Sequence, residues 1–119
     1  MMRGFTDIHA HFVYGIDDGA KTEADMYRML DAANADGIGC LFATPHATPG
    51  IYPFPEEGLR NGLAKARIYC RQMGYDLSLY EGAEILYTPA MERFAHERSL
   101  PTLAGSDLIL MEFVPDITM

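Results

Sequence analysis

The chain has 119 residues, of which 49% are hydrophobic and 22% charged, a composition typical of one globular domain and not of a disordered segment. Seventeen acidic against nine basic residues give a net charge of −8, which argues against nucleic acid as a partner because phosphate contacts need clustered Lys and Arg. No run of about 18 apolar residues is present for membrane insertion, and a secretory signal pattern is lacking, so we expect a cytoplasmic protein.

The first half of the chain predicts a strand, a helix and a second strand. A short strand is expected over residues 4–12, followed by a loop rich in Gly and Asp. Thr22 has the position of an N-cap, with Asp25 at the third helical position of a capping box. A helix of about 13 residues then ends near Gly37. Residues 38–43 are mostly apolar, which is typical of a strand buried on both faces.

The second half continues the same alternation. A second helix is expected to start near Pro55, because Pro and acidic residues favour a first turn, and to stop at Gly74. Residues 77–85 fit a third strand that is interrupted by a glycine, residues 88–98 a third helix, and residues 107–113 a fourth strand. This β-α-β-α-β-α-β order predicts an α/β fold with parallel strands and helical crossovers.

Potential metal ligands recur where the predicted strands end. In parallel α/β folds the loops after the carboxyl ends of the strands assemble on one side, and that side holds the active site. An i, i+2 pair of histidines on a strand also projects to one face. We therefore expect a shared polynuclear metal site. The candidate ligands, in chain order, are His9, His11, Asp18, His46, Glu84 and Glu112.

The mixture of imidazole and carboxylate ligands suits manganese, iron or zinc better than calcium. Two neighbouring acids are given other roles. Asp7 is expected to orient a histidine through its second ring nitrogen, and Asp17 is interpreted as a turn cap. The alternative for the whole set is a group of solvated loop side chains and helix-capping acids.

The two cysteines exclude one class of phosphatase. A thiolate-based tyrosine phosphatase needs an arginine six positions after its nucleophilic cysteine. In this chain His46 stands six positions after Cys40, and Asp76 stands six positions after Cys70. A cysteine nucleophile is therefore ruled out, and both thiols are expected to be reduced.

Five segments of the chain resemble the PHP (polymerase and histidinol phosphatase) domain. More narrowly, the chain resembles the PHP-type protein-tyrosine phosphatases of bacterial capsule and exopolysaccharide systems, the CpsB/YwqE type. The Asp-Asp-Gly-Ala-Lys sequence so soon after His-x-His is the most specific part of this match. The matching segments are DIHAH at 7–11, GIDDGAKT at 15–22, ATPH at 43–46, GAEI at 82–85 and LMEF at 110–113.

This resemblance implies parallel β-α repeats that form the N-terminal half of a distorted, TIM-like PHP barrel. It implies that the six candidate residues bind two to three divalent ions, most typically manganese, with Glu84 as the bridging carboxylate. Glu84, Asp18 and His46 would take part in catalysis through the bound metals. The implied reaction is hydrolysis of phosphotyrosine, on a protein such as a bacterial tyrosine kinase, by a metal-activated hydroxide.

A complete barrel of this kind approaches about 250 residues, whereas this chain stops seven residues after Glu112. We therefore expect residues 1–119 to be a single partial PHP domain, truncated at its C-terminus, that forms a homo-oligomer through unpaired barrel edges. Two other functions stay open. One is a PHP phosphatase for a small phosphomonoester such as histidinol phosphate. The other is a catalytically inactive metal-binding fragment or interaction module.

Overall fold

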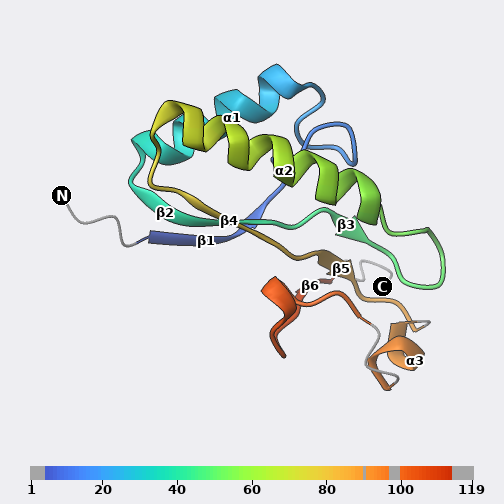
Figure 1. Cartoon of the computed structure of the whole chain (residues 1–119). Coiled ribbons are helices and arrows are strands. Elements are labelled where there is room, and N and C mark those ends of the chain that lie inside the picture. Colours follow the sequence, from blue (N-terminus) through green and yellow to red (C-terminus); the bar gives the residue numbers. More distant parts are fainter. Residues whose placement is uncertain (1–4, 90, 97–99, 114–119) are drawn as a thin grey trace, which may run out of the picture.

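The computed structural model describes residues 5–89, 91–96 and 100–113. The predicted alternation of strands and helices is confirmed, except that the predicted strand over residues 77–85 is divided in two and a further short strand follows residues 38–43 (Figure 1). The elements are β1 (Phe5–Ala10), α1 (Glu23–Ala35), β2 (Ile38–Ala43), β3 (His46–Ala47), α2 (Glu56–Met73), β4 (Ser78–Glu81), β5 (Glu84–Leu86), α3 (Met91–His96), the 3-10 helix η1 (Leu103–Gly105) and β6 (Leu110–Glu112).

The described strands form two parallel sheets, with the orders β1-β2-β4 and β3-β5-β6. The chain passes from the first sheet to the second twice, between β2 and β3 and between β4 and β5. The first passage contains Pro45, which has no N–H to donate to a sheet ladder, so the sheet is interrupted there. The bonds Gly82 N–Ala43 O and Glu84 N–Pro45 O, both 2.9 Å, continue the pairing across the break.

Helix α1 begins where its capping box predicts. Thr22 Oγ1 accepts a hydrogen bond from the Asp25 amide at 3.1 Å, and Asp25 Oδ2 accepts one from the Thr22 amide at 3.2 Å. These two bonds satisfy amides that have no partner within the first turn of a helix. The helix has 13 residues and ends just before Gly37, as expected.

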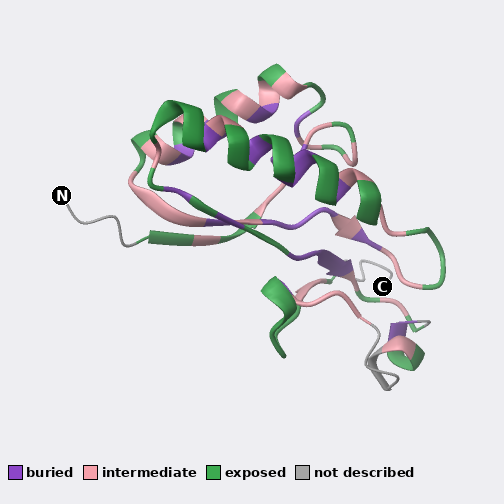
Figure 2. Ribbon diagram, in the orientation of Figure 1, coloured by how far each residue is buried: buried purple, intermediate pink, exposed green. Residues whose placement is uncertain are grey.

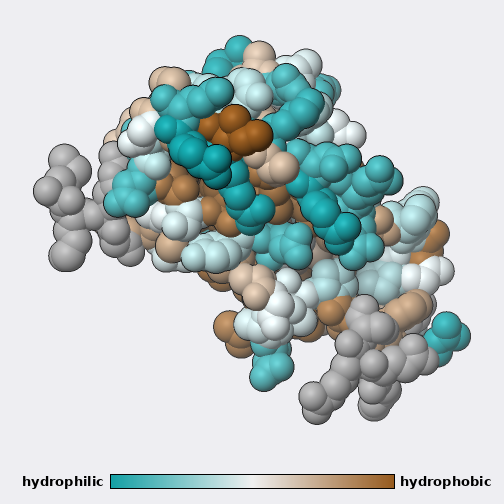
Figure 3. Space-filling view, in the orientation of Figure 1, coloured by the Kyte–Doolittle hydropathy of each residue, from teal (hydrophilic) through white to brown (hydrophobic). Residues whose placement is uncertain are grey.

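Helix α2 is amphipathic and covers the first sheet. It begins directly after Pro55 and ends at Gly74, which has the left-handed backbone conformation of a helix terminus, with φ of 71°. Figure 2 shows its buried residues on the side that faces the sheet, and Figure 3 shows hydrophilic side chains over its outward side. The buried residues are Leu59, Gly62, Leu63, Ala66 and Cys70.

Helices α1 and α2 lie together on one face of β1-β2-β4, and the main core fills the space between them (Figure 1). Met26 and Leu30 of α1 and Leu63 of α2 are almost completely buried in it, together with Phe12 from the loop after β1. A second, smaller cluster that contains Ile85 lies against the second sheet. The two clusters hold the strand ends rigidly on the side where the candidate ligands lie.

The structure corrects the bounds of the last two elements. Met91 N donates to Thr88 O at 3.0 Å, so a turn precedes α3 and the helix starts later than predicted. The last strand starts at Leu110, because the backbone of Leu108 is bonded to Leu103 and Ser106 in the preceding loop. Gly4 and Arg98, the predicted start of the first strand and end of the third helix, lie outside the described residues. None of the helices in the described ranges combines the length and apolar character of a membrane span.

Candidate metal centre

The two histidines of the His-x-His sequence converge, as predicted. His9 is the last residue but one of β1, and His11 follows directly after the strand. Their Nε2 atoms lie 3.2 Å apart, and the rings meet edge to face. Two ring nitrogens at this distance need a proton or a cation between them, because their lone pairs repel each other.

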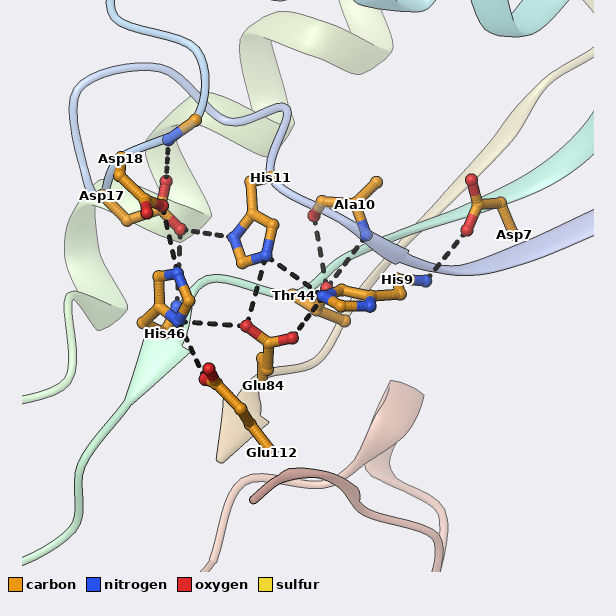
Figure 4. A network of polar contacts seen from close by, with 11 residues as sticks. Asp7, His9, Ala10, His11, Asp17, Asp18, Thr44, His46, Glu84 and Glu112 are labelled. Carbon is orange, nitrogen blue, oxygen red and sulfur yellow. Dashed lines mark hydrogen bonds and ion pairs between the residues drawn. The ribbon is translucent and has the colours of Figure 1, made fainter. Parts of the chain in front are cut away.

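Glu84 lies at the centre of the cluster (Figure 4). Its Oε1 atom is 3.0 Å from His46 Nδ1 and 3.4 Å from His11 Nε2, while Oε2 contacts His9 Nε2. The residue is only 7% exposed. Burial of a carboxylate is costly unless its oxygens have partners, and here three imidazoles surround it.

Asp18 and Glu112 extend the cluster at the two ring nitrogens of His46. His46 Nε2 is 3.0 Å from Asp18 Oδ1, and His46 Nδ1 is 3.6 Å from Glu112 Oε2. The Asp18 side chain is 79% exposed and that of Glu112 is 40% exposed. The cluster is therefore buried at Glu84 and open to solvent at these two acids.

The six residues come from the segments that the sequence indicated, but two of them hold different places in their strands. His46 begins β3 and does not lie in a loop, and Glu84 begins β5 where the sequence placed it at the end of the third strand. The reason is the interruption at Pro45, after which the chain pairs again as β3, while the third predicted strand breaks at the same level into β4 and β5.

Asp17 has a larger role than the predicted turn cap. Its Oδ1 atom does accept a hydrogen bond from the Gly19 amide at 2.9 Å. Its Oδ2 atom is 2.8 Å from His11 Nδ1, which must carry the proton of this bond because a carboxylate has none to donate. In the neutral imidazole the nitrogen with the free lone pair is then Nε2, which faces Glu84 and His9.

The role predicted for Asp7 is wrong. Asp7 Oδ1 accepts a hydrogen bond from the backbone amide of His9 at 3.0 Å, and the outer ring nitrogen of His11, Nδ1, is contacted by Asp17 instead. Asp17 stands six residues after His11, and the only signal for its role in the sequence is the pair of glycines that flank it and let the loop fold back.

The loop after β1 folds back tightly onto His11. Ala20 N donates to His11 O at 3.0 Å, and a Cβ atom placed on Gly19 would lie 2.1 Å from the same carbonyl oxygen. On its other side the loop packs against α2, where a Cβ atom on Gly62 would lie 2.3 Å from Val13 Cγ1. Glycines at both places allow the approach that brings Asp17 and Asp18 to the histidines.

A polar cluster fixes the outer part of this loop. Lys65 of α2 contacts Glu23 of α1 and donates to the Tyr14 hydroxyl at 3.0 Å. Tyr14 in turn donates to Glu23 at 3.3 Å. The hydrogen bond from Lys65 lowers the pKa of Glu23, and the bond to Glu23 raises the pKa of Lys65. The charged forms of both side chains are thus favoured at neutral pH.

The donor atoms of the cluster fit divalent metal ions. Three overlapping groups place one ligand atom per residue within 4.8 Å of one another. Donors on a single first-row ion, at about 2.0–2.2 Å from it, lie roughly 3 Å apart. Glu84 Oε1 lies at similar distances from His46 Nδ1, 3.0 Å, and from His11 Nε2, 3.4 Å. The groups are His11, Asp17, Asp18 and His46; His9, His11 and Glu84; and His46, Glu84 and Glu112.

Comparison with known proteins decides the family. The sequence model of the capsular polysaccharide synthesis family CpsB/CapC matches residues 5–119. The chain belongs to the CpsB/CapC family. Among curated members, the tyrosine-protein phosphatase CpsB of Streptococcus pneumoniae is 32% identical over 108 residues, which are 90% of this chain and 44% of that protein. The tyrosine-protein phosphatase YwqE of Bacillus subtilis is 32% identical over 107 residues, or 90% of this chain and 42% of its own length.

A solved structure of the family has the same fold. It comes from crystal structures of YwqE from Bacillus subtilis and CpsB from Streptococcus pneumoniae, which are described as unique metal-dependent tyrosine phosphatases. The TM-score is 0.78 at 31% sequence identity, over 94% of this chain and 47% of the solved chain. This CpsB/CapC chain therefore spans less than half the length of the relatives it matches.

Proposed function

We propose that this CpsB/CapC chain holds the metal centre of a metal-dependent protein-tyrosine phosphatase. The observation that carries the proposal is the convergence of three imidazoles on the buried carboxylate of Glu84. Relatives that share about a third of its residues are named tyrosine-protein phosphatases, and a solved relative is described as metal-dependent.

The proposed ligands are His9, His11, Asp18, His46, Glu84 and Glu112. Glu84 has the geometry of a bridging ligand, because Oε2 faces His9 while Oε1 faces His11 and His46. Asp17 would not bind a metal itself. It would orient His11 by keeping a proton on Nδ1, so that Nε2 is the nitrogen that binds the metal. Asp18 and His46 complete the catalytic part of the centre together with Glu84.

The overlap of the three donor groups supports two to three ions, since His11, His46 and Glu84 each belong to two groups. A ligand set of imidazoles and carboxylates suits manganese, iron or zinc, and the resemblance to the CpsB/YwqE type favours manganese among them. When bound, these ions lower the pKa of coordinated water toward neutrality and offset the charge of the phosphoryl oxygens.

The exposed side of the centre supports a substrate that is presented by another macromolecule. His9, Asp18 and Glu112 have side chains that are 46%, 79% and 40% exposed, so the centre opens at the surface. A phosphotyrosine ring on a protein can reach such a site with its phosphate foremost. We propose a phosphorylated protein, such as a bacterial tyrosine kinase, as the substrate.

The test combines metal binding with turnover on the whole chain. Manganese binding is measured by calorimetry, and manganese-dependent hydrolysis is measured for a phosphotyrosine peptide and for a small phosphomonoester. Loss of a residue that only orients a metal ligand weakens metal binding by about 10–100-fold. His9→Ala and Glu84→Gln remove proposed ligands themselves and should weaken manganese binding by more than this. Glu57→Gln, which makes the same chemical change on an exposed residue of α2, serves as the matched control.

Each result selects one function. Turnover of the peptide that both substitutions abolish supports the phosphatase, and faster turnover of the small ester supports the small-molecule alternative. Metal binding without turnover supports a metal-binding module whose catalysis requires residues outside this chain. If the wild-type chain binds no metal, the proposed function is wrong.

We also propose that residues 1–119 form the N-terminal half of a PHP-type barrel and that the chain alone associates through its uncovered edges. The likeness to 47% of a solved relative and the wholly parallel pairing support the half-barrel. Leu108 and Phe113, on either side of β6, are 67% and 65% exposed, an apolar edge of the kind that pairs with another chain. Sedimentation velocity tests the association, and a monomer with a sharp cooperative melt contradicts it.

A further inference from the structure

The strand that carries His9 is irregular between Asp7 and Ala10, the stretch that contains His9 itself. Asp7 lies opposite Leu41 and Ala10 lies opposite Ala43, so three steps along β1 correspond to two steps along β2. One extra residue is therefore accommodated on β1, as in a β-bulge, which changes the direction of the side chains beside it. The direction of the His9 side chain thus depends on how the backbone is held at Ala10, where the irregular stretch ends.

Thr44 holds that backbone at Ala10, the residue between the two histidines (Figure 4). The Ala10 amide donates to Thr44 Oγ1 at 3.0 Å, and the hydroxyl donates to the Ala10 carbonyl oxygen at 3.3 Å. The Thr44 amide donates to the same oxygen at 2.8 Å. One residue thus satisfies both main-chain polar groups of Ala10, and its side chain does so where the ladder between β1 and β2 ends.

We infer that Thr44 is a positioning residue that sets the spacing of His9 and His11, an inference that rests on the proposed metal function. The Ala10 N–H belongs to the peptide plane shared with His9, and the Ala10 carbonyl belongs to the plane shared with His11. Thr44 therefore fixes the peptide planes on both sides of Ala10. The orientation of these planes sets the direction of the Cα–Cβ bonds of His9 and His11. This matters because a metal centre needs its ligands within about 0.5 Å of the productive arrangement.

Thr44 is itself held firmly, which makes it suitable for this role. It is completely buried, with a relative exposure of 0%. Its methyl group faces the junction between β4 and β5, where a Cβ atom on Gly82 would lie 3.4 Å from Thr44 Cγ2. The hydroxyl is thereby directed at Ala10, and it has no exposure to water that could replace the bond.

Two substitutions separate the hydroxyl from the methyl group. Thr44→Val keeps the shape and removes the hydroxyl, whereas Thr44→Ser keeps the hydroxyl and removes the methyl. Tyr75→Phe is the control, because it removes a hydroxyl that donates to Asp31 at 2.7 Å, away from the metal centre. All variants are made in the full 119-residue chain.

The first measurement uses the metal-free protein. Hydrogen exchange of the Ala10 amide and the nuclear Overhauser effect between the His9 and His11 rings, whose centroids lie 5.2 Å apart, report the local geometry. Thr44→Val should lose the amide protection and the ring contact, while Thr44→Ser and Tyr75→Phe retain both. Retention of both in Thr44→Val overturns the inference.

The second measurement is manganese affinity by calorimetry. Thr44→Val should bind about 10–100-fold more weakly, as when an outer partner of a ligand is lost, and Thr44→Ser should stay close to the wild type. Tyr75→Phe should lower the melting temperature without a change in affinity. Equal affinity of Thr44→Val and wild type, or an equal loss in Thr44→Ser, overturns the role of the hydroxyl. Absence of manganese binding to the wild type contradicts the proposed function, and the metal-free measurement still decides the positioning role.

Discussion

His46 and Glu84 are register partners on the parallel strands β3 and β5, and His46 Nδ1 lies 3.0 Å from Glu84 Oε1. Partners in a sheet project to the same face, so this contact is a direct product of the strand register. A slip of one residue would turn one of the two side chains to the opposite face. The geometry of the candidate metal centre is therefore set by the pairing of its strands.

Manganese should stabilise the chain against heat. A ligand that binds only the folded state adds about 2.7 kcal/mol at 100 times its dissociation constant, and the donor groups of the centre exist together only when the strands are paired. Differential scanning calorimetry with manganese and with excess chelator should give a higher melting temperature in the presence of the metal. Glu84→Gln should remove this difference, and a metal-induced shift of wild-type size in that variant would contradict the ligand assignment.

Asp17→Asn should weaken metal binding without removing a proposed ligand. The amide can still accept from Gly19, but it no longer provides a charged acceptor for the proton on His11 Nδ1. We expect a loss of affinity of about 10–100-fold, measured by calorimetry. Asp7→Asn is the control, because within the described part of the chain Asp7 accepts a hydrogen bond from the His9 backbone amide and not from a histidine ring. An equal loss in both variants would show that the contact with His11 is unimportant.

Gly62→Ala should destabilise the chain although alanine favours helices. Alanine gains about 1 kcal/mol over glycine within a helix, but its Cβ atom would lie 2.3 Å from Val13 Cγ1 in the core. Overpacking of this kind costs about 1–3 kcal/mol. The free energy of unfolding from urea titrations should therefore fall. Val13→Ala in the same chain should recover part of the loss, and strict additivity of the two changes would contradict direct packing.

Asp31 should make stability depend on pH at both extremes. It accepts hydrogen bonds from the hydroxyls of Tyr69 at 2.6 Å and Tyr75 at 2.7 Å, which together lower its pKa. A lowered carboxyl pKa gives stability that is present above the unfolded value, about 3.9, and lost as the pH falls below it. The bond to Asp31 raises the pKa of Tyr69 to about 12, so the same contact should weaken as the pH rises from about 10 toward that value.

Urea titrations between pH 2 and pH 12 measure this dependence. Asp31→Asn should flatten both limbs of the curve, because it removes the charged acceptor. Tyr69→Phe should flatten the alkaline limb and leave part of the acid limb, which the bond from Tyr75 maintains. If Asp31→Asn and the wild type have parallel curves, the contact does not govern the pH dependence.

The sequence by itself determined the elements and most of the cluster. Capping residues, periodic apolar positions and turn residues act locally, so α1 and β2 have the predicted bounds. The six candidate ligands were found because parallel strands bring their loops together at one side, a rule that needs only the order of the elements. Whether they bind metal remains a prediction.

Only the tertiary structure decided how these residues meet. It assigned Asp17 to His11 and removed that role from Asp7, because the return of the loop onto His11 depends on packing against α2. It also gave Thr44 its contacts with Ala10, 34 residues away. Such contacts join segments that are distant in the chain, and their geometry is fixed by strand register and core packing, which local sequence patterns do not encode.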